Sequence, residues 1–171
     1  MRITRKETWG VIKYDTKSHC FTYTHSGEKE EQPYISKPIV LNIDLTLNCN
    51  MACYHCITRD MLNYLDQDLI VNENLIEQIN LSPFMVVVIT GGEPLLPQYE
   101  DKLLRLVRGI SKKGLIIDTN GSILPSDKIL MDLKRKNVLV RVSLDSIRIQ
   151  DELCLRHFPG SERRNIEVFD P

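Results

Sequence analysis

The chain has 171 residues, which is enough for one domain with a substantial hydrophobic core. Its 22 Lys and Arg residues nearly balance its 23 Asp and Glu residues, so charge predicts no nucleic-acid partner. The sequence has no run of about 18 apolar residues, so no membrane-spanning helix is predicted. Residues 1–7 lack the apolar core of a secretory signal, and we expect a cytoplasmic protein.

Residues 1–37 are expected to form an N-terminal part that consists of a β-hairpin and a linker. Strand-forming residues on both sides of the turn-forming residues 15–18 predict a β-hairpin over residues 8–25. The polar residues 26–33 show no periodicity and predict a linker. We therefore expect the hairpin to be an appendage of a main fold that occupies residues 38–171.

From residue 38 onward, segments with strand periodicity alternate with segments of helix periodicity. Asn72 and Ser126 are typical N-caps for two of the helices, and Gly114 is typical of the end of a helix over residues 99–112. Four strand–helix units in series predict an α/β protein with a parallel sheet. The expected strands cover residues 39–46, 84–90, 115–119 and 138–144.

Polar and apolar side chains alternate along the first and fourth predicted strands. Because the apolar set must face the helices, the polar set faces the other side of the sheet. We expect an open interior there, filled by water or substrate, although strand-end or edge positions would also explain polar residues. The polar set comprises Asn42, Asp44, Thr46, Arg141, Ser143 and Asp145.

Three cysteines, Cys49, Cys53 and Cys56, follow the first predicted strand with the spacing C-x3-C-x2-C. Parallel α/β proteins place their chemistry on loops that leave the carboxyl ends of strands. A structural zinc site needs four ligands, whereas an iron–sulfur cube held by three thiolates leaves one iron for a small molecule. His55 is a candidate fourth zinc ligand, but it is adjacent to Cys56. Zinc, a disulfide and buried thiols stay open as alternatives.

The cysteine motif, with Gly91-Gly92-Glu93-Pro94 after the second strand, resembles the radical S-adenosylmethionine (SAM) superfamily. The similar region covers about residues 38–170. It implies a (β/α) barrel of the TIM type, here a partial barrel of about four βα units that is truncated after the fourth strand. Further similar segments are residues 118–121, residues 142–146, and residues 156–161, the last as in members that act on peptides.

The resemblance implies that Cys49, Cys53 and Cys56 hold a 4Fe-4S cluster whose open iron takes SAM. It further implies that the glycine motif contacts the SAM amino group, that a strand-four pair contacts the ribose, and that an arginine contacts the carboxylate. The implied cofactor-binding residues are Gly91, Gly92, Glu93, Asn120, Ser143, Asp145 and Arg156.

The implied reaction is reductive cleavage of SAM to a 5′-deoxyadenosyl radical, which abstracts hydrogen from a small-molecule or peptide substrate. A protein such as ferredoxin or flavodoxin would donate the electron. Because the fourth strand would be an open sheet edge, we also expect a homodimer through that edge. The alternative hypothesis is a non-catalytic iron–sulfur or zinc-binding interaction module that retains the fold.

Overall fold

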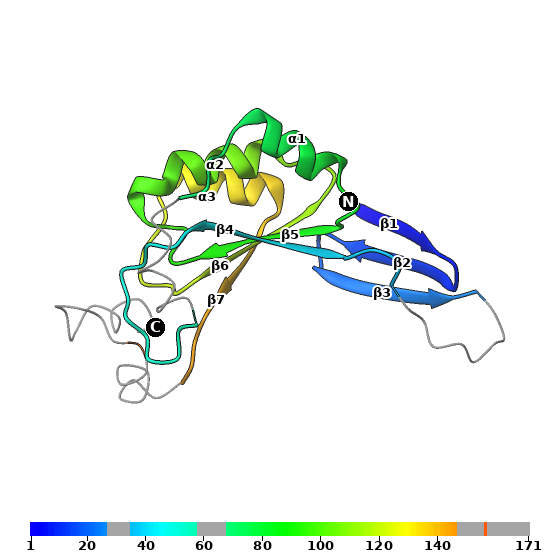
Figure 1. Ribbon diagram of the computed structural model, residues 1–171, viewed down its shortest axis with the longest axis horizontal. Coiled ribbons are helices and arrows are strands. Elements are labelled where there is room, and N and C mark those ends of the chain that lie inside the picture. The colour runs from blue at the N-terminus through cyan, green and yellow to red at the C-terminus, as the bar shows by residue number, and fades with distance from the viewer. Residues whose placement is uncertain (27–34, 58–67, 147–155, 157–171) are drawn as a thin grey trace.

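The computed structural model describes residues 1–26, 35–57, 68–146 and 156. Strands β1–β3 form an antiparallel sheet in the order β1-β2-β3, and strands β4–β7 form a sheet in the order β4-β5-β6-β7 whose neighbours are all parallel (Figure 1). The elements are β1 (Arg2–Glu7), β2 (Gly10–Asp15), β3 (Cys20–His25), β4 (Val40–Thr46), α1 (Glu73–Leu81), β5 (Val86–Gly91), the 3₁₀ helix η2 (Pro97–Tyr99), α2 (Glu100–Gly109), β6 (Gly114–Thr119), α3 (Asp127–Lys136) and β7 (Leu139–Val142).

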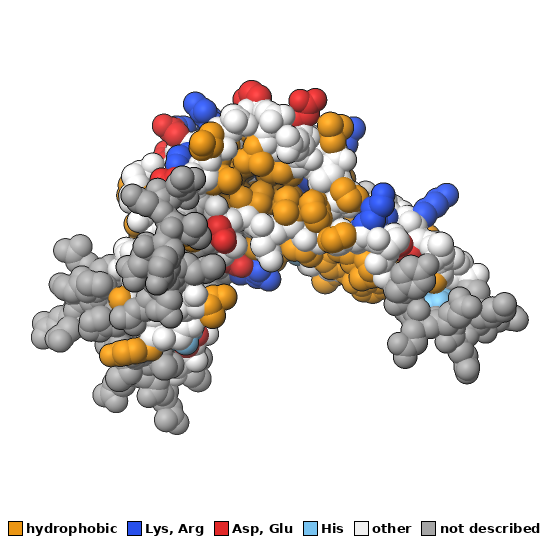
Figure 2. Space-filling model, viewed as in Figure 1, with side chains coloured by type: hydrophobic (Ala, Val, Ile, Leu, Met, Phe, Trp, Pro, Cys, Tyr) orange, Lys and Arg blue, Asp and Glu red, His pale blue; other side chains and the backbone are white. Residues whose placement is uncertain are grey.

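Helices α1, α2 and α3 lie together on one face of the parallel sheet (Figure 1). The main core lies between these two layers, where Val87 and Ile89 of β5 and Leu103 of α2 are fully buried. Figure 2 shows hydrophobic side chains gathered beneath the helices, and charged side chains on the outer side of the helices. None of the helices in the described part of the chain has the length and apolar character needed to cross a membrane.

The helix starts follow the predicted caps, but one predicted helix end is wrong. The side chain of Asn72 accepts a hydrogen bond from the Leu75 N–H at the start of α1, and Ser126 accepts one from the Ile129 N–H at the start of α3. Helix α2 ends at Gly109, whereas Gly114 is the first residue of β6. The glycine therefore serves a strand and not a helix end.

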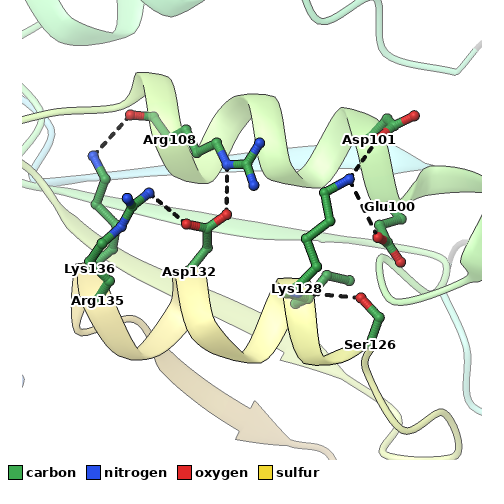
Figure 3. A network of polar contacts seen from close by, with 9 residues as sticks. Glu100, Asp101, Arg108, Ser126, Lys128, Asp132, Arg135 and Lys136 are labelled. Atoms are coloured by element: carbon green, nitrogen blue, oxygen red, sulfur yellow. Dashed lines mark hydrogen bonds and ion pairs between the residues drawn. The ribbon is translucent and has the colours of Figure 1, made fainter.

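A buried carboxylate joins α2 to α3 (Figure 3). Asp132 of α3 is 8% exposed, and its oxygens lie 2.6 Å from Arg108 Nε of α2 and 2.5 Å from Arg135 Nη2. At the other end of α3, Lys128 lies 3.4 Å from Asp101 and 3.7 Å from Glu100. Arg108 and Lys128 thus link α2 and α3 near both ends of α3.

The predicted hairpin is present as β2 and β3, and β1 adds a third strand that we did not predict. Contrary to our expectation, these strands are not an appendage. Ile12 and Tyr14 of β2 are almost completely buried, and they pack against Val86 and Val88 on the face of β5 opposite the helices. The boundary at residue 37 stays a prediction, but the N-terminal sheet shares a core with the parallel sheet.

Gly114 is required by this packing between the two sheets. A Cβ atom at Gly114 would lie 2.1 Å from Cε1 of Tyr14, which real Cβ atoms do not approach. The Tyr14 ring is held in turn by a 2.8 Å hydrogen bond between its hydroxyl and His19 Nδ1. The tyrosine therefore occupies the space that a side chain on β6 would need.

The sheet face opposite the helices is polar mainly toward the carboxyl ends of the strands, although Asn42 of β4, beside Val88, is also exposed. There Arg141 of β7 makes two hydrogen bonds, of 2.6 and 2.7 Å, to Asp118 of β6, and Asp44 is exposed. At the amino ends the same face is apolar, because the N-terminal sheet covers it. Thr46 departs from the prediction, because a bulge between Asp44 and Thr46 shifts the register and Thr46 is buried.

Strand β7 is shorter than predicted and forms one edge of the described sheet, paired with β6. Its register sets Val140 beside Ile117, so Val140 and Val142 lie on the helix-facing side of the sheet. They are nevertheless 39% and 46% exposed. The homodimer through this edge stays a prediction.

Replacing Tyr14 by Ala should lower the free energy of unfolding by about 3 kcal/mol or more, because the cavity left between the sheets cannot close. Tyr23 on the neighbouring strand β3 is the matched control, since it is 55% exposed. Tyr23→Ala should cost about 1 kcal/mol, mostly from lost ring contacts. Chemical denaturation measures both, and equal losses would contradict the shared core.

Candidate functional site

The three predicted cluster ligands lie on a loop that leaves the carboxyl end of β4. We call residues 47–57 the cysteine loop, and Figure 1 shows it passing close to the end of β7. Cys49 is exposed to solvent, and Cys53 and Cys56 are half-buried. A backbone hydrogen bond of 3.2 Å from Cys56 N–H to Cys53 C=O gives the loop a tight turn between its last two thiols.

The cysteine loop is held against the end of β5 by backbone contacts. The N–H groups of Gly92 and Glu93 donate to the carbonyls of Thr46 and Asn48, at 2.7 and 2.8 Å. A Cβ atom on Gly92 would lie 2.0 Å from the Asn48 carbonyl oxygen, and Gly91 has a φ of 119°. Both glycines are therefore needed to let the loop approach the strand, in addition to the cofactor contact that the sequence predicts for them.

Glu93 is fully buried, and its carboxylate points into the protein. One oxygen accepts hydrogen bonds from Leu95 N–H at 2.9 Å and Thr119 Oγ1 at 2.8 Å, and the other accepts one from Asn120 N–H at 2.7 Å. Burial raises the pKa of this carboxyl group above 4.5, and the three hydrogen bonds oppose that rise. Glu93 thus joins the end of β5 to the end of β6, and its contact with a cofactor stays a prediction.

Asn120 brings the end of β6 to the first cysteine. Its side-chain Nδ2 lies 2.9 Å from Asn50 Oδ1 and 3.7 Å from Cys49 Sγ. Its Oδ1 accepts from Ser122, and Asn50 Nδ2 donates to Ser122 Oγ at 2.8 Å. The sequence had pointed to Asn120 but not to Asn50 or Ser122, whose small polar side chains carry no motif of their own.

The surrounding protein opposes the ionisation of two of the thiols, those of Cys49 and Cys53, and raises the pKa of each. Although Cys49 is partly open to solvent, desolvation by the surrounding protein raises its pKa, while hydrogen bonds from Met51 N–H and Asn120 Nδ2 to its sulfur oppose the rise. Burial also raises the pKa of Cys53, and the Arg156 guanidinium opposes that rise. The charges of Cys49, Cys56 and Asp145 raise the pKa of Cys53 further.

The positions of the thiols can be compared with the two kinds of metal site considered above. Within the described residues, no group of three His, Cys, Asp or Glu side chains converges closely enough to hold a single metal ion. A tetrahedral zinc site needs such convergence. An iron–sulfur cube does not, because each thiolate binds a different iron. Three thiols on one loop match the three protein ligands of a cube with one open iron, whereas a structural zinc site needs a fourth protein ligand.

Asp145 and Arg156, both predicted from the sequence, form an ion pair in the structure. Arg156 Nε lies 2.8 Å from Asp145 Oδ2, and the arginine is 6% exposed. The same oxygen lies 3.2 Å from His55 Nε2 of the cysteine loop. Ser143 is exposed, and its backbone N–H bonds to the Thr119 carbonyl at 2.8 Å. The segment after β7 thus also contacts the cysteine loop, through Asp145 and His55.

A further polar network, which we did not predict, ties the start of the cysteine loop to residue 68. Thr46 Oγ1 donates to Asp68 Oδ1 at 2.7 Å, and Lys102 Nζ of α2 lies 3.1 Å from Asp68 Oδ2. Asn48 Nδ2 donates to the hydroxyl of Tyr99. Hydrogen bonds from Thr46, Lys102 and Tyr99 lower the pKa of Asp68 against its desolvation. The bulge at Thr46, which turns this residue inward, had no signal in the alternating pattern.

Comparison with known proteins assigns this arrangement to a family. The model of the Radical SAM superfamily matches residues 43–168. The chain is 32% identical over 114 residues to a GTP 3′,8-cyclase of Helicobacter pylori, covering 63% of this chain and 35% of that protein. It is 31% identical over 134 residues to an S-adenosylmethionine-dependent nucleotide dehydratase of a Thermoplasmatales archaeon, covering 73% and 44%.

Solved structures show the same fold. SuiB of Streptococcus suis superposes with a TM-score of 0.65 when bound to S-adenosylmethionine and 0.62 when bound to the precursor peptide SuiA. The identities are 15% and 14%, and the match covers 98% of this chain and 51% or 52% of SuiB. The chain spans under half the length of the two curated relatives above. The predicted partial barrel is confirmed, and the chain belongs to the Radical SAM superfamily, whose enzymes use a 4Fe-4S cluster and SAM.

Proposed function

We propose that this chain is the cluster-binding and SAM-binding part of a radical SAM enzyme. The observation that carries the proposal is the meeting of three strand ends at one loop: β5 through its glycines, β6 through Asn120, and β7 through Asp145. Cys49, Cys53 and Cys56 would hold the 4Fe-4S cluster. When bound, the cluster and SAM together supply one-electron cleavage of the sulfonium and hydrogen abstraction from a substrate.

The remaining residues position these groups. Gly91 and Gly92 would present backbone groups to the SAM amino group beside the cysteine loop. Ser143 and Asp145 would bind the ribose, and Arg156, which now pairs with Asp145, would pair with the SAM carboxylate. Glu93 would hold the end of β5 against the end of β6, because it follows β5 and its carboxylate accepts hydrogen bonds from Thr119 and Asn120.

Two substrate classes are supported by the similar proteins. The names of the curated relatives point to nucleotides, and the SuiB complex points to a peptide. The polar inner face at the carboxyl ends of the strands, with its paired Asp118 and Arg141, would accommodate a polar group of either class. A protein donor such as ferredoxin or flavodoxin would supply the electron.

Anaerobic reconstitution with iron and sulfide tests the proposal. The wild-type chain should take up a 4Fe-4S cluster and, on reduction with dithionite, cleave SAM to methionine and 5′-deoxyadenosine. Replacing Cys49, Cys53 or Cys56 by Ala should lower cluster retention about 100-fold or more, because losing a ligand costs more than losing a residue that only contacts a ligand. Cys20→Ala is the matched control, because Cys20 is an exposed free thiol on β3.

Three other outcomes separate the alternatives. A bound cluster without SAM cleavage would favour the non-catalytic module. Stoichiometric zinc in a colourless protein would contradict both the radical SAM enzyme and the non-catalytic iron–sulfur module. Faster SAM cleavage with GTP or with a peptide would choose between the two substrate classes.

Glu93→Gln should lower the free energy of unfolding by about 1–3 kcal/mol. The amide N–H₂ of glutamine would face an N–H or O–H group that now donates to a carboxylate oxygen of Glu93. Since the pKa of Glu93 is higher in the folded than in the unfolded state, its stabilising contribution is complete below about pH 4.5 and decreases as pH rises through the folded-state pKa. The loss should therefore be largest at low pH. Chemical denaturation between pH 4 and 8 measures this loss of stability, and a loss that does not change with pH would contradict the raised pKa of Glu93. Glu77→Gln, at an exposed site on α1, should be neutral.

A further inference from the structure

We propose that the side-chain amide of Asn120 donates a hydrogen bond to the Cys49 thiolate and thereby raises the reduction potential of the cluster. Asn120 Nδ2 lies 3.7 Å from Cys49 Sγ, although the two residues are 71 positions apart in the chain. This inference rests on the proposed function, because it concerns a ligand of the proposed cluster. It goes beyond that function by giving Asn120 a contact with a ligand sulfur.

The hydrogen bonds around Asn120 decide which end of its amide faces the sulfur. One end accepts from the backbone N–H of Ser122 at 2.9 Å, and a backbone N–H can only donate. That end must therefore be the oxygen, and the hydroxyl of Ser122 donates to it as well, at 2.6 Å. The other end is the N–H₂ group, which is directed at Cys49 and Asn50.

Two further contacts prevent the amide from turning away. One N–H of Asn120 Nδ2 is taken by Asn50 Oδ1 at 2.9 Å, and Asn50 is itself oriented because its Nδ2 donates to Ser122 Oγ at 2.8 Å. The backbone N–H of Asn120 donates to the buried carboxylate of Glu93 at 2.7 Å. These contacts satisfy the side-chain oxygen and the first side-chain N–H of Asn120, so its second side-chain N–H is left to donate to Cys49 Sγ.

A donor to a ligand sulfur acts on the redox equilibrium. The reduced cluster carries one more negative charge than the oxidised one, so a fixed donor stabilises the reduced state more. Cys49 Sγ also accepts from the Met51 N–H at 3.4 Å, so the backbone and a side chain act on the same sulfur. Of these two donors, only Asn120 can be removed by substitution without altering the backbone.

The test is a redox titration of the reconstituted 171-residue chain, followed by electron paramagnetic resonance of the reduced cluster. In Asn120→Ala the ratio of reduced to oxidised cluster at a fixed potential should fall about tenfold, which is 59 mV for a one-electron couple. Asn50→Ala is the comparison variant, because it removes one contact of the Asn120 amide and an oxygen that lies 4.0 Å from the same sulfur, but leaves the donor and its Ser122 anchor. Its ratio should therefore fall by clearly less than in Asn120→Ala.

Asn120→Asp provides a second variant if the alanine variant does not load a cluster. The carboxylate keeps the acceptor for Ser122 but puts an oxygen in place of the donor, so the ratio should fall by more than in Asn120→Ala. Equal potentials in the wild type and either Asn120 variant would overturn the inference, as would an equally large shift in Asn50→Ala. A wild-type chain that binds no cluster, by iron and sulfide analysis, would overturn the proposed function as well.

Discussion

The site depends on one buried carboxylate. Glu93 accepts three hydrogen bonds at zero exposure, two of them from Thr119 and Asn120 at the end of the neighbouring strand. A buried acceptor with this many donors is costly to leave unsatisfied, so the two strand ends are held at one spacing. Because the Glu93 N–H also binds Asn48, the carboxylate and its own backbone connect β6 to the cysteine loop through one residue.

The N-terminal sheet stabilises the face of the parallel sheet that the helices leave uncovered. Val86 and Val88 lie on that face, and the four parallel strands of the described residues form a sheet with two edges that does not close around them. Ile12 and Tyr14 cover these residues from the other side, so water is excluded from the amino end of the sheet while the carboxyl end stays polar. On the face opposite the helices, the amino-end half therefore belongs to the core, whereas the carboxyl-end half presents polar side chains.

Sequence patterns correctly predicted features that depend on residues close together in the chain. The alternation before Thr46, the caps Asn72 and Ser126 and the spacing of the cysteines each involve neighbours along the chain, and the first two are confirmed. Gly114 was misassigned because its partner, the Tyr14 ring, lies 100 positions away. The inward direction of Glu93 and the grouping of His55 with Asp145 were likewise unpredictable, since a motif does not say which way its side chain turns once the strands are packed.

Strand β5 carries both tasks on a single segment. Val86 at one end contributes to the core shared with the N-terminal sheet, and Gly91 at the other end receives the cysteine loop. At about 3.3 Å per residue these two positions are roughly 16 Å apart, beyond the distance at which substitutions usually influence each other. The stability of the scaffold and the properties of the proposed cluster site can therefore be altered independently, both by natural drift and by engineering.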